Sequence, residues 1–167
     1  NVEEIKNGNF IEIKFNIFES EKLLVERINV LGNNVTNEDV IRGELLIDEG
    51  DPFTKLSLDK SISKIKSRGI FKKVVSETLD GTENNLKIIN INVEEKATGE
   101  IMAGAGFGTS GASFSVGVKE NNYLGRGIKF DTNFLVSEDS IRGQIGITNP
   151  NFKNSDKAVS FNIQSLE

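Results

Sequence analysis

Apolar and polar side chains alternate along much of this sequence with the period of two residues that is typical of β-strands. The first alternating segment covers residues 10–18 and reads FIEIKFNIF. Later ones cover residues 24–31, 71–79 and 85–95, and the last two flank a polar loop. These patterns predict four strands, of which the first is interpreted as the last strand of a preceding module.

Between the second and third of these strands the spacing of apolar residues becomes helical. Thr36 precedes Asp39 by three residues, which approximates a capping box and predicts a helix that ends near Gly50. A second helix is predicted by an N-terminal serine, three apolar residues at helical spacing and a C-terminal glycine, namely Ser57, Leu58, Ile62, Ile65 and Gly69. The order β-α-α-β-β over about 75 residues predicts a compact α+β module.

Residues 99–167 have no helical period and contain five further alternating segments, which predict an antiparallel β-meander. Their non-apolar side is rich in Gly, Ser and Asn and carries charges of both signs. A soluble sandwich would turn the apolar side inward, whereas a membrane-spanning barrel would turn it toward lipid. Strand lengths near ten residues suit a bilayer crossing, but the residues alone leave both architectures open.

Composition narrows the classes of function. The 167 residues include no Cys, His or Trp, which removes thiol nucleophiles, imidazole bases, disulfides and the usual transition-metal ligands. An enzyme, a cofactor and a metal are therefore not expected. The net charge of -5, with scattered Lys and Arg, argues against a nucleic-acid partner. The chain begins at Asn1 without a signal peptide, so we interpret it as a segment of a longer protein.

Two motifs that could suggest ligand binding do not have the required context. The stretch Gly106-Phe107-Gly108-Thr109-Ser110-Gly111 has the spacing of a phosphate-binding loop, but an alternating strand follows it instead of a helix. A hairpin tip is the better interpretation. The acidic cluster of Asp48, Glu49 and Asp51 lacks the alternate ligand positions of a calcium loop, so we interpret it as a solvated helix end.

A series of motifs in one order carries a family resemblance across nearly the whole chain. They are Val25-Glu26-Arg27-Ile28, Gly32-Asn33, Thr36, Val40-Ile41-Arg42, Glu49-Gly50-Asp51-Pro52-Phe53, Ser61, Gly69-Ile70-Phe71, Val93-Glu94-Glu95-Lys96-Ala97-Thr98-Gly99, Gly106-Phe107-Gly108-Thr109, Asn122-Tyr123-Leu124-Gly125-Arg126-Gly127 and Thr148-Asn149-Pro150-Asn151-Phe152. The chain resembles the last POTRA domain and the first barrel strands of the BamA family of outer-membrane β-barrel assembly factors.

The resemblance implies a fold and three regions. The fold is an α+β POTRA module followed by the N-terminal strands of a transmembrane β-barrel. Residues 1–22 would end a preceding POTRA domain, residues 23–97 would form the POTRA domain, and residues 98–167 would form the first barrel strands. The POTRA domain would lie in the periplasm of a Gram-negative bacterium and the strands in its outer membrane.

The implied function is the assembly and insertion of β-barrel proteins into the outer membrane without ATP. The implied partners are nascent outer-membrane β-barrel proteins, accessory lipoproteins of the BAM complex and outer-membrane lipid. Two alternatives remain: a polypeptide translocation or secretion barrel of the same superfamily, and a soluble β-rich binding protein.

Three sets of residues are candidates for this function. An exposed sheet edge would pair with client strands through Phe71, Lys72, Lys73, Val74, Val75, Ser76, Glu77, Thr78 and Leu79. The first barrel strand would form a weakly held seam through Gly99, Glu100, Ile101, Met102, Ala103, Gly104, Ala105, Gly106 and Phe107. By analogy with the family, an accessory lipoprotein would contact Arg42, Glu44 and Glu49, although Gly43 replaces a basic residue that the family often has after the arginine.

Overall fold

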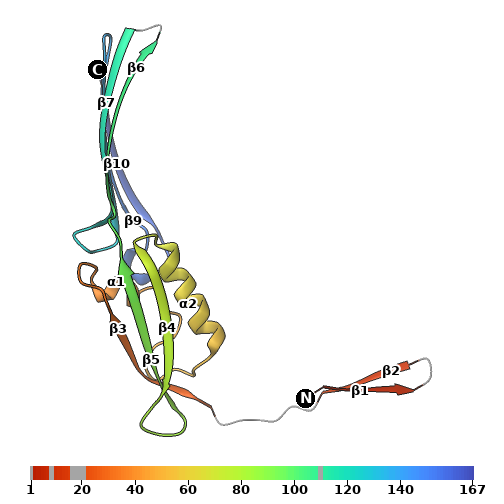
Figure 1. Ribbon diagram of the computed structural model, residues 1–167. Coiled ribbons are helices and arrows are strands. Elements are labelled where there is room, and N and C mark those ends of the chain that lie inside the picture. The colour runs from red at the N-terminus through yellow and green to blue at the C-terminus, as the bar shows by residue number, and fades with distance from the viewer. Residues whose placement is uncertain (1, 8–9, 16–21, 109–110) are drawn as a thin grey trace.

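The computed structural model describes residues 2–7, 10–15, 22–108 and 111–167 (Figure 1). Its elements are β1 (Val2–Asn7), β2 (Phe10–Phe15), β3 (Leu24–Leu31), α1 (Glu38–Arg42), α2 (Lys55–Ser67), β4 (Phe71–Asp80), β5 (Leu86–Glu95), β6 (Gly99–Gly108), β7 (Gly111–Tyr123), β8 (Ile128–Ser137), β9 (Ile141–Asn149), a short 3-10 helix (Phe152–Asn154) and β10 (Val159–Leu166). They form a β1-β2 hairpin, a β3-β5-β4 sheet and a β10-β9-β8-β7-β6 sheet.

The predicted strand over residues 10–18 is confirmed for β2, whereas residues 16–18 lie outside the described residues. Its antiparallel partner β1 was not predicted. The predicted strands over residues 24–31, 71–79 and 85–95 are confirmed as β3, β4 and β5. In their sheet β5 is central, parallel to β3 and antiparallel to β4.

The core of the α+β module lies between this sheet and its two helices, and Figure 1 shows α2 along the sheet. Alternate residues of β5 point inward toward the apolar stripe of α2. The buried residues of β3 and β4 are three apart, because a bulge interrupts the alternation in each strand. The most deeply buried apolar side chains are Val25, Ile28, Ile41, Ile65, Ile70, Ile89 and Ile91. The module thus has its own hydrophobic core.

The second helix is confirmed, with one difference at its start. Thr54 is the N-cap of α2, and its side chain accepts a hydrogen bond from the Ser57 backbone N–H at 3.2 Å. Ser57 itself lies inside the first turn and is not the cap. Gly69 has a φ of +69°, which confirms the predicted left-handed residue that ends the helix.

The first helix is much shorter than predicted, and the predicted cap is wrong. It covers only Glu38–Arg42 and begins after Asn37, which makes no side-chain cap. Thr36 is not available as a cap because its backbone N–H donates to a Glu95 carboxylate oxygen at 2.6 Å and its hydroxyl accepts from Asn122. A tertiary contact has therefore replaced the local one.

The five strands predicted over residues 99–167 are confirmed as the consecutive meander β6 to β10. The tip at Thr109 and Ser110 lies outside the described residues. β6 and β10 are the edge strands of this sheet, which is open across the described residues. The α+β module followed by an antiparallel meander confirms the predicted fold class.

The register of the meander gathers the apolar side chains on one face. Residues that lie opposite each other in antiparallel strands share a face of the sheet. Val118 lies opposite Ile101, and Phe130 lies opposite Ile147, which in turn lies opposite Phe161. Most of these side chains are exposed. Among the described residues, no helix combines the length and apolar character needed to cross a membrane.

Candidate functional site

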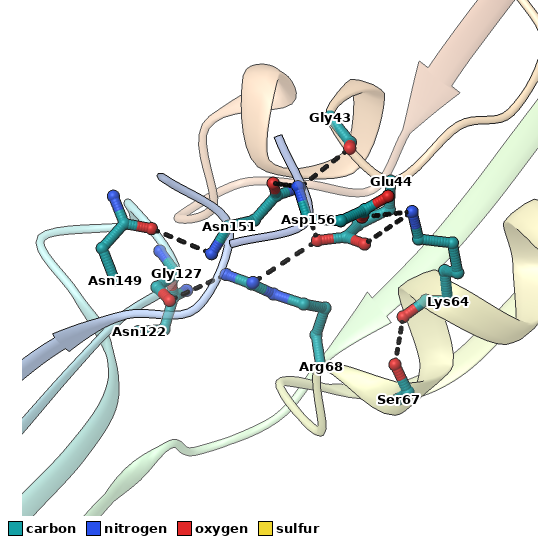
Figure 2. A network of polar contacts seen from close by, with 10 residues as sticks. All are labelled: Gly43, Glu44, Lys64, Ser67, Arg68, Asn122, Gly127, Asn149, Asn151 and Asp156. Atoms are coloured by element: carbon teal, nitrogen blue, oxygen red, sulfur yellow. Dashed lines mark hydrogen bonds and ion pairs between the residues drawn. The ribbon is translucent and has the colours of Figure 1, made fainter. Parts of the chain in front are cut away.

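Two connections of the meander lie against the α+β module and form a polar junction (Figure 2). One is the turn between β7 and β8, at residues 124–127, and the other is the β9–β10 connection, at residues 150–158. The β7–β8 turn is bonded to the loop before α1 and to the end of α2. The β9–β10 connection is bonded to the region after α1 and to α2. This junction, together with residues 96–98 between β5 and β6, sets how the two parts of the chain are joined.

Glu44 lies at the centre of the junction and is only 6% exposed. One of its carboxylate oxygens lies 3.4 Å from the Arg68 guanidinium and accepts a hydrogen bond from the Asn151 side chain at 3.1 Å. Asn151 also donates to the backbone oxygen of Gly43 at 2.9 Å. Burying a carboxylate is costly unless it is hydrogen-bonded and ion-paired, so these contacts hold the β9–β10 connection against the module.

Two basic residues complete the network around Glu44, namely Lys64 within α2 and Arg68 at its C-terminal cap. Arg68 also donates to the backbone oxygen of Gly127 at 2.8 Å, so it links the β7–β8 turn to Glu44, which in turn bonds the β9–β10 connection. Burial lowers the pKa of Arg68 and the charge of Glu44 opposes that shift. Lys64 contacts Asp156 at 2.7 Å and Glu44 at 3.8 Å.

The β7–β8 turn makes a second set of contacts. The buried Asn122 side chain donates to the Thr36 hydroxyl at 2.9 Å and accepts from the Gly127 backbone N–H at 2.7 Å. The Asn37 backbone N–H donates to the Gly125 carbonyl at 2.8 Å. Because Gly125 has a φ of +72° and lies against the Val35 carbonyl, no larger residue fits without a shift.

The loop that receives this turn is fixed from inside the module by Glu95. Its carboxylate accepts hydrogen bonds from the backbone N–H groups of Asn34, Val35 and Thr36, at distances from 2.6 to 3.3 Å. Burial opposes ionisation of this carboxyl, but the hydrogen bonds from Thr36, Val35 and Asn34 outweigh it and lower the pKa of Glu95. The last residue of β5 therefore holds the loop that contacts the meander.

The predicted client-binding strand is β4, which forms one edge of the module's sheet. The Gly81 N–H donates to the Leu86 carbonyl at 2.9 Å, so position 81 is a hydrogen-bonded position of the β4–β5 ladder. In an antiparallel ladder every second residue is hydrogen-bonded to the partner strand, and the residues between them are not. By the register of β4 and β5, the backbone groups of Ser76 and Thr78 consequently point away from β5. They form an unpaired backbone edge.

A groove of about 440 Å³ runs along the start of this edge. It is lined by Lys66, Phe71, Lys72, Lys73, Val74 and Val75. Val75 and Leu79 are half-exposed on the face of the sheet opposite to the core. The edge therefore offers both backbone groups and apolar side chains to an extended chain.

The predicted seam strand is β6, the edge of the meander next to β7. All ten of its residues are exposed, and small residues fill several of its positions. Ile101 and Phe107 are more than 80% exposed. The strand is held through its ladder with β7 alone among the described strands.

The three residues predicted to contact a lipoprotein are separated by the structure. Glu44 lies in the buried junction described above. Arg42 and Glu49 lie 3.6 Å apart beside the outer edge of β3, where both bond the backbone of Ile28. Partner binding through these residues stays a prediction.

Sequence reasoning missed the junction itself. Asn122 and Asn151 were noted only as parts of turn motifs, and Arg68 was not singled out. Turn motifs that contain asparagine carried a signal, since an Asn side chain can bond a neighbouring element as well as its own turn. Nothing local in the sequence links Glu44 to Asn151, which is 107 residues away.

The comparisons with known proteins match both parts of the chain. A family model described as POTRA, surface antigen variable number repeat, matches residues 23–96. The chain is 28% identical over 160 residues to a putative outer membrane protein assembly factor of Treponema pallidum (strain Nichols), which covers 92% of the chain and 19% of the relative. It is 26% identical over 156 residues to outer membrane protein assembly factor BamA of Neisseria meningitidis serogroup B, with the same two coverages.

Among solved structures, the crystal structure of BamA from Haemophilus ducreyi lacking POTRA domains 1-3 is similar to this chain with a TM-score of 0.79 and 24% sequence identity. The match covers 99% of this chain and 32% of that chain. This likeness concerns the fold, and it extends across the junction between module and meander. The chain spans about a fifth of the length of the curated relatives, at 19% of each.

Proposed function

We propose that the chain is a member of the BamA family of outer membrane protein assembly factors and that it helps to insert β-barrel proteins into the outer membrane by pairing extended clients with β4. The POTRA domain would lie in the periplasm, and β6 to β10 would be the first strands of a barrel in the outer membrane. The observation that carries this proposal is the unpaired edge of β4 beside an open groove.

Backbone pairing suits a protein that must accept many clients. A strand added to a sheet edge is held by main-chain hydrogen bonds, which do not depend on the identity of the client's side chains. The half-exposed Val75 and Leu79 would add contacts with the alternating apolar residues that every barrel strand carries. This pairing would require neither a covalent reaction nor ATP.

The meander would supply the second pairing surface. β6 presents a free edge of small residues at the start of the sheet, and its exposed apolar side chains would face lipid. We propose that residues Gly99 to Phe107 close the barrel seam and, when it opens, template an incoming strand. The junction would keep the β4 edge at a fixed position relative to that seam.

A proline in β4 tests the proposal. Ser76→Pro removes an outward N–H and places a ring on the free edge without breaking a bond to β5. We expect insertion of a denatured client barrel into liposomes by the complete protein to slow by about tenfold, the effect of losing one to two edge hydrogen bonds.

Ser76→Ala is the matched control, because it changes the side chain and keeps the N–H. We expect it to insert clients at the wild-type rate. Circular dichroism of both variants checks that the module remains folded. An insertion rate for Ser76→Pro equal to that of Ser76→Ala would exclude β4 as the client edge.

A further inference from the structure

The sheet of this module has two edge strands, β3 and β4, and in the described part of the chain most of the β3 edge is already bonded. The first half of the β3 edge is covered by residues 50–53. Gly50 donates to the Val25 carbonyl at 2.7 Å, and the Val25 N–H donates to the Asp51 carbonyl at 2.9 Å. The Phe53 N–H donates to the Leu23 carbonyl at 2.8 Å. This segment therefore occupies the place that an added strand would take.

In the middle of the β3 edge, two side chains form hydrogen bonds with the backbone N–H and C=O of a single residue, Ile28. The Ile28 N–H donates to a Glu49 carboxylate oxygen at 3.0 Å. The Arg42 guanidinium donates to the Ile28 carbonyl at 2.8 Å. The two side chains also lie 3.6 Å from each other, so they form a closed ring of contacts around Ile28.

The position of Ile28 makes this pair of contacts effective. In a parallel ladder, alternate residues present both their N–H and their C=O to the same side. The bulge between Val25 and Arg27 resets that alternation, so Val25, Ile28 and Val30 present their groups to the outer edge. Val30 is then the only edge-facing position of β3 that is not already bonded within the described part of the chain.

Arg42 is itself held in place from a third side. Its Nε donates to the Glu38 carboxylate at 2.6 Å, one turn earlier on α1. That hydrogen bond raises the pKa of Arg42 further above its already high ordinary value. Lysine would not reproduce this arrangement, because it lacks the fork of donors that bonds two partners at once.

We propose that Arg42 and Glu49 plug the β3 edge and thereby direct extended clients to β4. The inference rests on the proposed function of β4 and names the residues that make the pairing selective. An edge strand with free backbone groups accepts other strands indiscriminately, and proteins block such edges with charged side chains. Here the charged side chains bond the backbone directly instead of only repelling a neighbour.

The two edges differ as this proposal requires. At β4 the outward groups of Ser76 and Thr78 face open solvent beside the groove, with no side chain of the described residues bonded to them. At β3 the equivalent positions are bonded by Glu49, Arg42 and residues 50–53.

Cysteine crosslinking on the complete protein tests the plug, and this chain contributes no cysteine of its own. Leu31→Cys reports on the β3 edge and Val75→Cys on the β4 edge, and both positions are about half-exposed. The probe is an extended peptide with alternating apolar residues and one cysteine. We expect it to crosslink at Val75→Cys and only weakly at Leu31→Cys.

Glu49→Ala, with or without Arg42→Ala, should raise the yield at Leu31→Cys by about fivefold, because one edge hydrogen bond becomes available to the peptide. The yield at Val75→Cys should not change. Glu49→Gln retains an oxygen that can accept from Ile28 and should keep the edge closed. Asp39→Asn is the matched control, because Asp39 is an exposed acidic residue of α1 whose side chain bonds neither Arg42 nor the β3 backbone among the described residues.

The outcomes separate the plug from the function on which it rests. Crosslinking at Val75→Cys without an increased yield at Leu31→Cys in any variant would overturn the proposal that Arg42 and Glu49 block β3, but it would still support client pairing at β4. Equal yields at both edges in the wild-type background would overturn it as well. Failure to crosslink at Val75→Cys would instead remove the proposed function. Amide hydrogen exchange of the module distinguishes a lost fold from an opened edge.

Discussion

Replacing Glu44 with alanine is expected to release the POTRA domain from the turns of the meander, at a cost of about 3 kcal/mol in docking free energy. The substitution removes the acidic partner of Arg68, whose side chain is only 10% exposed, and of Lys64. A buried guanidinium without a counter-charge is costly, so Arg68 must move toward solvent and abandon Gly127. Asn151 loses an acceptor at the same time.

Pulsed electron-electron double resonance measures this release as the distance between spin labels attached at positions 77 and 160. We expect a narrow distance distribution in the wild-type protein and a broad one in Glu44→Ala. Glu44→Gln is the control that separates charge from shape, because it keeps the acceptor for Asn151 and restores little of the pairing with Arg68. An unchanged distribution in Glu44→Ala would show that backbone contacts and the 96–98 connection hold the junction without the ion pairs.

Gly125→Ala is expected to open the other half of the junction, with an effect of about 3 kcal/mol on the contact between the β7–β8 turn and the loop before α1. At a φ of +72° a Cβ is strained, and it would also meet the backbone carbonyl of Val35. The loop must retreat, which breaks the hydrogen bond from Asn37 to Gly125. Hydrogen exchange at the Asn37 amide should accelerate by about a hundredfold.

Gly69→Ala, in the α+β module, provides a matched control for the backbone strain. Gly69 has a φ of +69°, nearly that of Gly125, but a Cβ there meets nothing within 4 Å. It should cost about 1 kcal/mol of backbone strain and leave exchange at Asn37 unchanged. Similar behaviour of the two variants at Asn37 would mean that the close approach to Val35 contributes nothing to docking.

Elements whose pattern reflects burial could be predicted from the sequence. The residues at helical spacing in α2, Leu58, Ile62 and Ile65, are all buried, and Ile89 and Ile91 alternate as β5 requires. The strands of the meander could be predicted in the same way, because the register keeps the apolar residues on one face along all five strands. Periodicity predicts what a whole element buries.

Features decided by single long-range contacts could not be predicted. Thr36 has the sequence of a helix cap, but Glu95 and Asn122 bond it instead and α1 is reduced to five residues. Glu44 looks like an ordinary surface charge until Arg68 and Asn151 are brought to it. In each case a partner at least 24 positions away decides the outcome, and no local rule identifies that partner.

The candidate pairing edge shows both situations. The alternation of apolar and polar residues predicted that β4 is a strand. Its position at an edge depends on the sheet order β3-β5-β4, which the sequence does not reveal. The blocking of β3 depends further on Arg42 and Glu49, which sequence reasoning grouped with Glu44 as one partner surface. The fold instead gives these charges different partners, because Glu44 bonds the junction whereas Arg42 and Glu49 bond the backbone of β3.

Amide hydrogen exchange of the complete protein, with and without an extended client peptide, tests the central claim most directly. If clients pair with β4, the outward amides of Ser76 and Thr78 become protected when the peptide is added, while those of Val75 and Glu77, already bonded to β5, change little. This alternating pattern is specific to strand addition. Uniform protection along β4, or none at Ser76 and Thr78 at a saturating peptide concentration, would contradict the account.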